Sequence, residues 1–339
     1  MDLHLTAEQI LLRDSAAKFG AAAGPKVARA LRGRSPSFAP ERLRQVGELG
    51  WLGMLAPSSA DGPGLGLTEL ALVLEQAGRG LVCEPIGLAI IAAAALAQGH
   101  APHPILPRVI RGDALVVPAL QEGAHDPFAL RTQETSDRAP RLTGTKMSVC
   151  ADGAEGFLVS ARGSDGPALY YVPRNGAGVS VATAPTVDGR TLATVELKDA
   201  PADLVPARQS SRSAMEALTD LALIALSAEL LGVMEAAQEL TFEYLRVRKQ
   251  FGKPIGSFQA LQHKAVDIYI KTETVRSLLY QVAAANDPYR IDPALAVAVK
   301  AKTSEDALAV TQTCIHINPG SPTWGPVRSP KPASQPKDH

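Results

Sequence analysis

The chain has 339 residues, of which 46% are hydrophobic and 20% charged, so it is long enough to bury a core of two or three packed layers or subdomains. Lysine plus arginine and aspartate plus glutamate number 34 each, so the overall charge does not favour binding to nucleic acid or to an anionic membrane. The three cysteines have no paired spacing and the seven histidines no ligand spacing, so the sequence predicts neither a disulfide framework nor a metal site.

The amino-terminal residues Met1–Glu8 are acidic and polar, which differs from the basic and then apolar pattern of a secretory signal peptide. The apolar run over Ile86–Ala97 is too short to span a bilayer. We therefore expect a cytoplasmic protein without membrane insertion.

Residues 5–110 are predicted to form helices. Thr6 and Gln9 have the spacing of a capping box, which predicts a helix start. Pro40 is expected to open a further helix, and Thr68 is expected to cap the helix after the glycine-rich segment 61–67. These patterns predict an all-helical N-terminal domain over residues 1–114.

The pattern changes to short β-rich runs between residues 115 and 206. The runs at 114–120, 156–161, 168–173 and 192–197 are separated by glycine, aspartate and proline turns. A middle domain built on a small sheet or barrel is the prediction for 115–206.

Residues 207–317 are predicted to form three long helices. The first runs from Ser213 to Gln250, which corresponds to roughly 55 Å at 1.5 Å per residue. The second runs from about Ser257 to Asn286 and the third from Asp292 to about Ile317. Three such helices leave a wide apolar surface, so we expect an oligomeric partner to cover it.

Three glutamates recur at four-residue intervals on the first of these helices, at Glu235, Glu239 and Glu243. This spacing predicts one solvated stripe on a helix that is otherwise apolar around most of its circumference. Such a helix is typical of the packing element of a bundle.

The composition changes abruptly in residues 318–339, which contain six prolines and no leucine. Such a segment cannot continue a bundle helix, and it is predicted to be a disordered tail. The sequence is equally compatible with a native tail and with an altered reading frame.

The segment Arg246–Gln259, which reads RVRKQFGKPIGSFQ, joins the first two long helices. A cationic last turn, a glycine at the stop and a proline two residues later are ordinary features of a helix end. They do not explain Phe251 together with Phe258 and Gln259 at this spacing.

This segment closely resembles the Arg-x-x-Phe-Gly…Phe-Gln element of acyl-CoA dehydrogenases, which clamps the flavin dinucleotide in that family. The resemblance extends, with gaps, from residue 3 to about residue 317. It implies an α+β fold with an N-terminal helical domain, a middle β-sheet or barrel domain and a C-terminal helical bundle, here truncated.

The resemblance implies FAD as the cofactor. Arg248 would give a planar, charge-assisted fork to the pyrophosphate. The other residues that resemble those bordering the dinucleotide are Lys249, Gln250, Phe251, Phe258 and Gln259. In the family these residues reach the flavin of a neighbouring subunit, which again implies an oligomer.

The middle domain resembles the family in part. The stretch Leu142–Val159 matches the Leu-x-Gly-x-Lys…Ala-Asp strand pair. Gln121–Phe128 stands where a Thr-Glu-Pro-x-Ala-Gly-Ser-Asp loop is expected, and Met147–Cys150 replaces an aromatic-Ile-Thr-Asn segment. These departures favour a flavin pocket that another chain helps to complete.

The family reaction needs a carboxylate that removes the proton next to the thioester. One family position for it is in register with Ala222, and the other, near the C-terminus, has no recognisable glutamate here. Asp220 is a weak candidate for a substitute base. The alternative is that Asp220 is a polar helix residue that pairs by spacing with Glu216.

The sequence therefore predicts a subunit of an acyl-CoA dehydrogenase that forms 2-enoyl-CoA, as in lipid or sterol side-chain β-oxidation. It resembles base-lacking subunits of heteromeric actinobacterial enzymes, which pair with a related, base-bearing chain. Electron-transfer flavoprotein is the expected electron acceptor, with oxygen as the alternative. The remaining alternatives are a self-sufficient homo-oligomer and a non-enzymatic scaffold that binds acyl-CoA or a partner.

Overall fold

The computed structural model describes residues 5–99, 101–123, 129–135, 139–206 and 211–318. The tail predicted over 318–339 lies outside these ranges except for Asn318. That side chain donates to Thr241 Oγ1 at 2.9 Å and so ties the end of the last helix to the bundle.

The N-terminal part is helical, as predicted. Its helices are α1 (Ala7–Ala21), α2 (Gly24–Leu31), α3 (Pro40–Glu48), α4 (Leu67–Arg79), α5 (Ile86–Leu96) and α6 (Leu106–Ile110), with a short 3₁₀ turn at Ser58–Ala60. Thr6 and Gln9 form the predicted capping box. The prediction for Thr68 was wrong, because Gly66 is the N-cap of α4 and its N–H donates to Glu69 Oε2 at 2.9 Å.

The middle part is a sheet in the order β6-β7-β3-β2-β4-β5-β8, with β1 parallel to β4. The strands are β1 (Val116–Ala119), β2 (Gln133–Glu134), β3 (Arg141–Val149), β4 (Gly156–Gly163), β5 (Gly166–Pro173), β6 (Val179–Pro185), β7 (Thr191–Pro201) and β8 (Asp203–Leu204). All four β-rich runs seen in the sequence contain strands. The edge strand β6 is mostly exposed and was not predicted.

The C-terminal part consists of α7 (Ser211–Val247), α8 (Gln259–Ala285) and α9 (Pro293–Ile317), close to the predicted ranges. Helix α7 is long and apolar enough to cross a membrane, and more than half of its most apolar window is buried. It packs against α4, α8 and α9. We therefore assign it as the central core helix.

Helices α4 and α7 cross in unusually close contact. A Cβ atom at Gly78 would lie 2.0 Å from the carbonyl oxygen of Glu229, and one at Gly232 would lie 1.9 Å from the carbonyl oxygen of Glu75. No side chain can occupy either position at this separation, so the two glycines allow the backbones to touch. This crossing joins the N-terminal helices to the C-terminal bundle.

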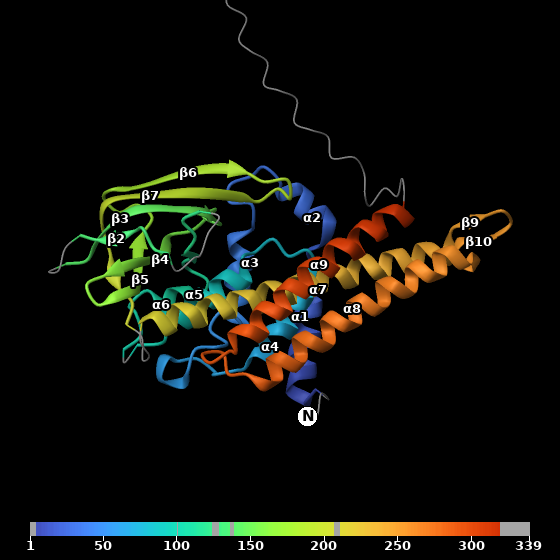
Figure 1. Ribbon diagram of the computed structural model, residues 1–339, viewed down its shortest axis with the longest axis horizontal. Helices are drawn as coiled ribbons and strands as arrows, with labels where there is room; N and C mark the ends of the chain where they lie inside the picture. The colour runs from blue at the N-terminus through green and yellow to red at the C-terminus, as the bar shows by residue number, and fades with distance from the viewer. Residues whose placement is uncertain (1–4, 100, 124–128, 136–138, 207–210, 319–339) are drawn as a thin grey trace, which may run out of the picture.

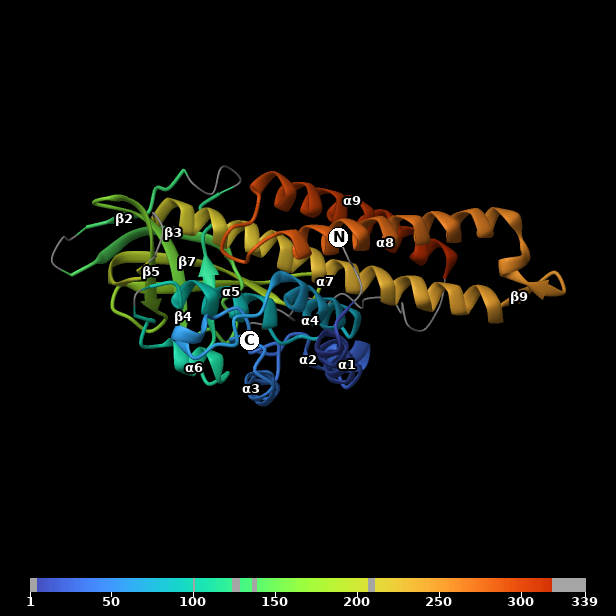
Figure 2. The ribbon, with the colours of Figure 1, turned by 90° about the horizontal axis from the view of Figure 1, so that it is seen from below.

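The sheet and the far end of the bundle lie at opposite ends of the molecule (Figure 1). Helix α7 runs from the sheet along the length of the helical part and ends at a small hairpin, labelled β9 and β10, which projects from that end in both views (Figure 2). The structure confirms the α+β fold expected from the sequence.

Candidate flavin-binding hairpin

The segment after α7 forms a tight hairpin. Helix α7 ends at Val247, strand β9 (Lys249–Gln250) pairs with β10 (Lys253–Pro254), and a 3₁₀ turn at Ile255–Ser257 leads to α8. Phe251 and Gly252 occupy the tip with φ angles of 51° and 78°. Glycine adopts such an angle without cost, whereas phenylalanine does so rarely, and strained positions of this kind cluster at binding sites.

The aromatic side chains at this end are poorly covered by their own chain. Phe251 is 91% exposed, although apolar burial would favour covering so large a ring. Its ring contacts Phe258 edge-on with the centroids 6.1 Å apart, and Lys253 Nζ lies 4.6 Å from the centroid of Phe258. The hairpin therefore presents an aromatic surface without a cover.

The hairpin is also locally cationic. Between residues 246 and 259 the chain carries Arg246, Arg248, Lys249 and Lys253 and no acidic residue, although the whole chain is neutral. Arg248, Lys249 and Gln250 are exposed, as is Gln259 at the start of α8. Exposed guanidinium and ammonium groups beside aromatic faces fit a ligand with phosphates and flat rings.

The six residues predicted to contact the cofactor thus lie together, at the end of the molecule opposite the sheet (Figure 2). They cannot contact a flavin that is bound on the sheet of their own chain. A ligand held here must be shared with another chain or bind at this end alone.

The sheet contains an ion pair between Lys146 and Glu122. Glu122 belongs to the segment Gln121–Phe128, which stands where the family loop is expected. Lys146 Nζ lies 2.5 Å from Glu122 Oε1 and donates to Ser160 Oγ at 2.9 Å, and the lysine side chain is fully buried. Burial lowers the pKa of Lys146, whereas the hydrogen bond from Lys146 is the largest influence that lowers the pKa of Glu122 against its own desolvation. Residues 124–128 of the same loop lie outside the described ranges.

The replaced segment Met147–Cys150 forms an irregularity in β3. The pairing of β3 with β7 shifts register between Lys146 and Val149, and Ser148 has a φ angle of 55°. Met147 is exposed. These side chains therefore do not continue the regular alternation of the strand.

Ala222 is half-buried on α7 and packs against the core. Asp220 is 7% exposed, and its pKa is raised by burial and by the negative charges of Glu216 and Asp292. The predicted attractive pairing with Glu216 was wrong, because two carboxylates repel each other. Asp292 is the N-cap of α9, so Asp220 lies near the start of that helix.

One carboxylate near Ala222 was missed in the sequence. Glu229 follows Ala222 by seven residues, two helical turns, and so lies on the same face of α7. It borders a cavity and has no hydrogen bond or ion pair within the described ranges. The sequence signal was an acidic residue between apolar neighbours, which is also compatible with a solvated position.

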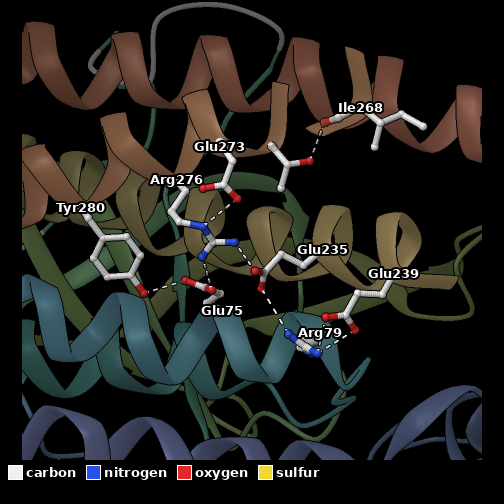
Figure 3. A network of polar contacts seen from close by, with 9 residues as sticks. Glu75, Arg79, Glu235, Glu239, Ile268, Glu273, Arg276 and Tyr280 are labelled. Atoms are coloured by element: carbon white, nitrogen blue, oxygen red, sulfur yellow. Dashed lines mark hydrogen bonds and ion pairs between the residues drawn. The ribbon is translucent and has the colours of Figure 1, made fainter. Parts of the chain in front are cut away.

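The glutamates expected to form a solvated stripe behave differently from one another. Glu239 and Glu243 are exposed, but the Glu235 side chain is only 14% exposed and is bound by Arg276 of α8 (Figure 3). Arg276 also binds Glu75 of α4 at 2.7 Å, and Tyr280 donates to the same glutamate at 2.6 Å. The prediction of a solvated stripe was thus wrong for Glu235. Its ion-pair partner, Arg276, is 41 residues away in sequence and could not be recognised from the spacing along α7.

Comparison with known proteins places these features in a family. A model described as "Acyl-CoA dehydrogenase, N-terminal domain" matches residues 6–101, and one described as "Acyl-CoA dehydrogenase, C-terminal domain" matches residues 212–320. The chain belongs to the acyl-CoA dehydrogenase family. This is a family of oxidoreductases whose cofactor is FAD, in agreement with the expectation from the sequence.

Acyl-CoA dehydrogenase FadE27 of Mycobacterium tuberculosis is 32% identical over 253 residues, which cover 73% of this chain and 66% of the relative. The chain thus spans about two thirds of that relative.

Two solved structures whose titles each name two proteins are also similar to this chain. A variant of the Tcur3481-Tcur3483 steroid acyl-CoA dehydrogenase aligns with a TM-score of 0.85 and 31% identity over 92% of this chain and 87% of that chain. The ChsE4-ChsE5 complex from Mycobacterium tuberculosis aligns with a TM-score of 0.83 and 30% identity over 94% of this chain and 88% of that chain.

Proposed function

We propose that this chain is the base-lacking subunit of a heteromeric acyl-CoA dehydrogenase, in which its hairpin completes the FAD site of a related, base-bearing chain. The observation that carries the proposal is the exposed hairpin at the end of the molecule away from the sheet, with Phe251 uncovered and four cations beside it. The family position on α7 for the base holds Ala222, which cannot accept a proton. The two-chain relatives supply a precedent for divided subunits.

The residues of the hairpin have separate tasks in this proposal. Arg248 would hold the pyrophosphate of FAD, Phe251 and Phe258 would lie against the dinucleotide, and Lys249, Gln250 and Gln259 would supply polar groups beside it. Bound FAD would supply the acceptor for the hydride that leaves the carbon β to the thioester carbonyl. The partner's carboxylate removes the α-proton, so that acyl-CoA becomes 2-enoyl-CoA.

The enzyme would act in the cytoplasm on an acyl-CoA in lipid or sterol side-chain catabolism and pass its electrons to electron-transfer flavoprotein. The steroid label of one relative supports the sterol substrate class.

The test is the flavin spectrum of the chain purified alone and together with its base-bearing candidate partner, followed by anaerobic titration with acyl-CoA. We expect bound flavin and bleaching only in the complex. Bleaching by the chain alone would contradict the divided site and would direct attention to Asp220. No flavin in either sample would favour the scaffold alternative.

The residue-level test is Arg248→Ala in the same complex, with Arg34→Ala as the matched control at another exposed arginine. Loss of a charge-assisted contact to the pyrophosphate should weaken flavin retention about tenfold or more. The control should leave it unchanged. Equal retention by both variants would show that the hairpin does not contact the cofactor.

A further inference from the structure

The last helix, α9, exposes a face that is almost free of charge. Seven exposed residues follow one another at helical spacing on the side opposite its buried residues, and we call them the α9 stripe: Ala294, Ala298, Ala301, Glu305, Leu308, Gln312 and Ile315. Glu305 is the only acidic or basic side chain among them. A helix that faces water usually carries several charges on this side, so the α9 stripe has the composition of a covered face.

The α9 stripe is divided by side-chain size. Its first half carries only the methyl groups of three alanines, whereas its second half carries Leu308 and Ile315, which are 60% and 48% exposed. Glu305 lies between the two halves. Val297, which is 56% exposed, flanks the small half and does not belong to the stripe. The stripe therefore has recesses in one half and protruding side chains in the other.

Helix α8, which packs beside α9, shows the same division. Val266 and Ile270 are more than half exposed in the part of α8 that follows the hairpin, and Ser277 and Ala284 are exposed in the other part. The two helices run in opposite directions on the side of α7 away from α1, α2 and α3 (Figure 2). The large exposed side chains of both helices thus lie in the half nearer the hairpin, and the small ones lie in the other half.

A second copy of the chain fits this division. A two-fold axis through the middle of the α9 stripe would place the two α9 helices antiparallel, so that the large half of each copy meets the small half of the other. In a parallel arrangement large side chains would meet large ones. The 25 residues of α9 are about 37 Å long, so α9 and α8 together present on the order of 700 Å² on each copy. A stable interface buries about 800 Å² on each partner.

We propose that two copies of this chain associate through α8 and α9, with their α9 helices antiparallel about an axis close to Glu305. In this register Ala301 of each copy meets Leu308 of the other, and Ala294 meets Ile315. The two Glu305 carboxylates come close to each other at the axis, where their like charges oppose the association. The inference does not rest on the proposed function, because it needs neither FAD nor the base-bearing chain.

The test is sedimentation equilibrium of the full chain purified alone, for which we expect a reversible dimer. Leu308→Asp should weaken this dimer about tenfold or more, because the interface would desolvate a carboxylate. Leu11→Asp on α1 is the matched control, since Leu11 is a helical leucine that is 69% exposed, and it should leave the equilibrium unchanged. Glu305→Gln should strengthen the dimer about twofold, because it removes the repulsion at the axis.

An exchange of side-chain size tests the pairing itself. Ala301→Leu and Leu308→Ala should each weaken the dimer about tenfold, because the two-fold axis repeats every change on the other copy. The variant with both changes should regain most of the affinity, since a large side chain would again meet a small one. Circular dichroism checks that each variant keeps the fold of the unmodified chain.

Four results would overturn the proposal. They are a monomer at every concentration, a dimer that Leu308→Asp does not weaken, losses that add up in the variant with both size changes, and assembly through Leu308 only when the related chain is present. The last result would assign this surface to the related chain. None of these measurements needs flavin or a thioester, so failure of the proposed function would be distinguishable from failure of this inference.

Discussion

At the scale of single residues, two half-buried carboxylates have different surroundings. Glu122 accepts hydrogen bonds from Lys146 and from the N–H groups of Arg131 and Thr132, so its charge is fully compensated. Glu229 has no such compensation within the described ranges. The first arrangement stabilises the sheet, because the buried Lys146 keeps a hydrogen-bonded counter-charge.

Replacing Glu122 by alanine should destabilise the fold by about 3 kcal/mol, because Lys146 would remain buried without a counter-charge. Chemical denaturation measures this loss. The double variant Glu122→Ala, Lys146→Met should recover much of it. Glu196→Ala removes the partner of exposed Lys198 and should change stability by less than about 0.5 kcal/mol. A Glu122 effect as small as that control would refute the argument.

The residues predicted for cofactor binding all lie within residues 248–259, so local turn chemistry and the motif were sufficient to bring them together. Glu229 could not be recognised in the same way. The cavity that it borders is also lined by α2, the end of α4 and the β6–β7 turn, which are far from it in sequence. Only tertiary packing shows that this carboxyl group is unpaired and faces a cavity.

At the scale of elements, the long helices were predictable because their apolar periodicity is local, and glycine and proline mark where they end. Strand β6 was missed because its side chains are largely exposed and carry no strong apolar alternation. The ion network around Arg276 was also missed. It links α4, α7 and α8 through Glu75 and Glu235 (Figure 3). Its members lie on three different helices, so the residue pattern of one helix does not indicate it.

This network predicts a dependence of stability on pH. Burial and the neighbouring Glu75 raise the pKa of Glu235 to about 7, above the value of about 4.3 for an unfolded glutamate. The folded state binds the proton of Glu235 more tightly than the unfolded state does. Protonated Glu235 therefore contributes to the free energy of unfolding at low pH, and this contribution is lost as the pH rises towards 7. We expect the free energy of unfolding to fall by about 3 kcal/mol over this interval through this group.

The check is denaturation of Glu235→Gln between pH 4.5 and 8. This variant should lose the downward slope, because a glutamine does not titrate. Glu239→Gln removes an exposed carboxylate of the same helix and should keep the slope. If Glu235→Gln and the unmodified chain show parallel curves, Glu235 is not the titrating group.

At the scale of the whole molecule, the exposed apolar side chains are concentrated on the C-terminal helices. Val266, Tyr269 and Ile270 follow one face of α8 and are each more than half exposed, and Phe251 extends this surface at the hairpin. Burying such a surface is favourable in water. It lies beside the segment that, in the proposed function, reaches a flavin on another chain.

An association test follows from this surface. Ile270→Asp should weaken assembly with a second chain by tenfold or more, because a desolvated carboxylate opposes burial. Light scattering during size-exclusion chromatography measures the mass of the assembly. Leu11→Asp on α1 replaces an equally apolar residue that is 69% exposed and should leave the mass unchanged. A loss of assembly in both variants, or in neither, would argue against the α8 surface.

The close crossing of α4 and α7 has a further consequence for folding. Gly78 and Glu229 touch although 150 residues, including the whole sheet, separate them in the sequence. The chain must therefore close a long loop before this contact forms, which slows folding and leaves both apolar helices uncovered meanwhile. Neither helical part expressed alone would contain its mating surface, so truncation at the sheet should yield aggregating fragments rather than two independent domains.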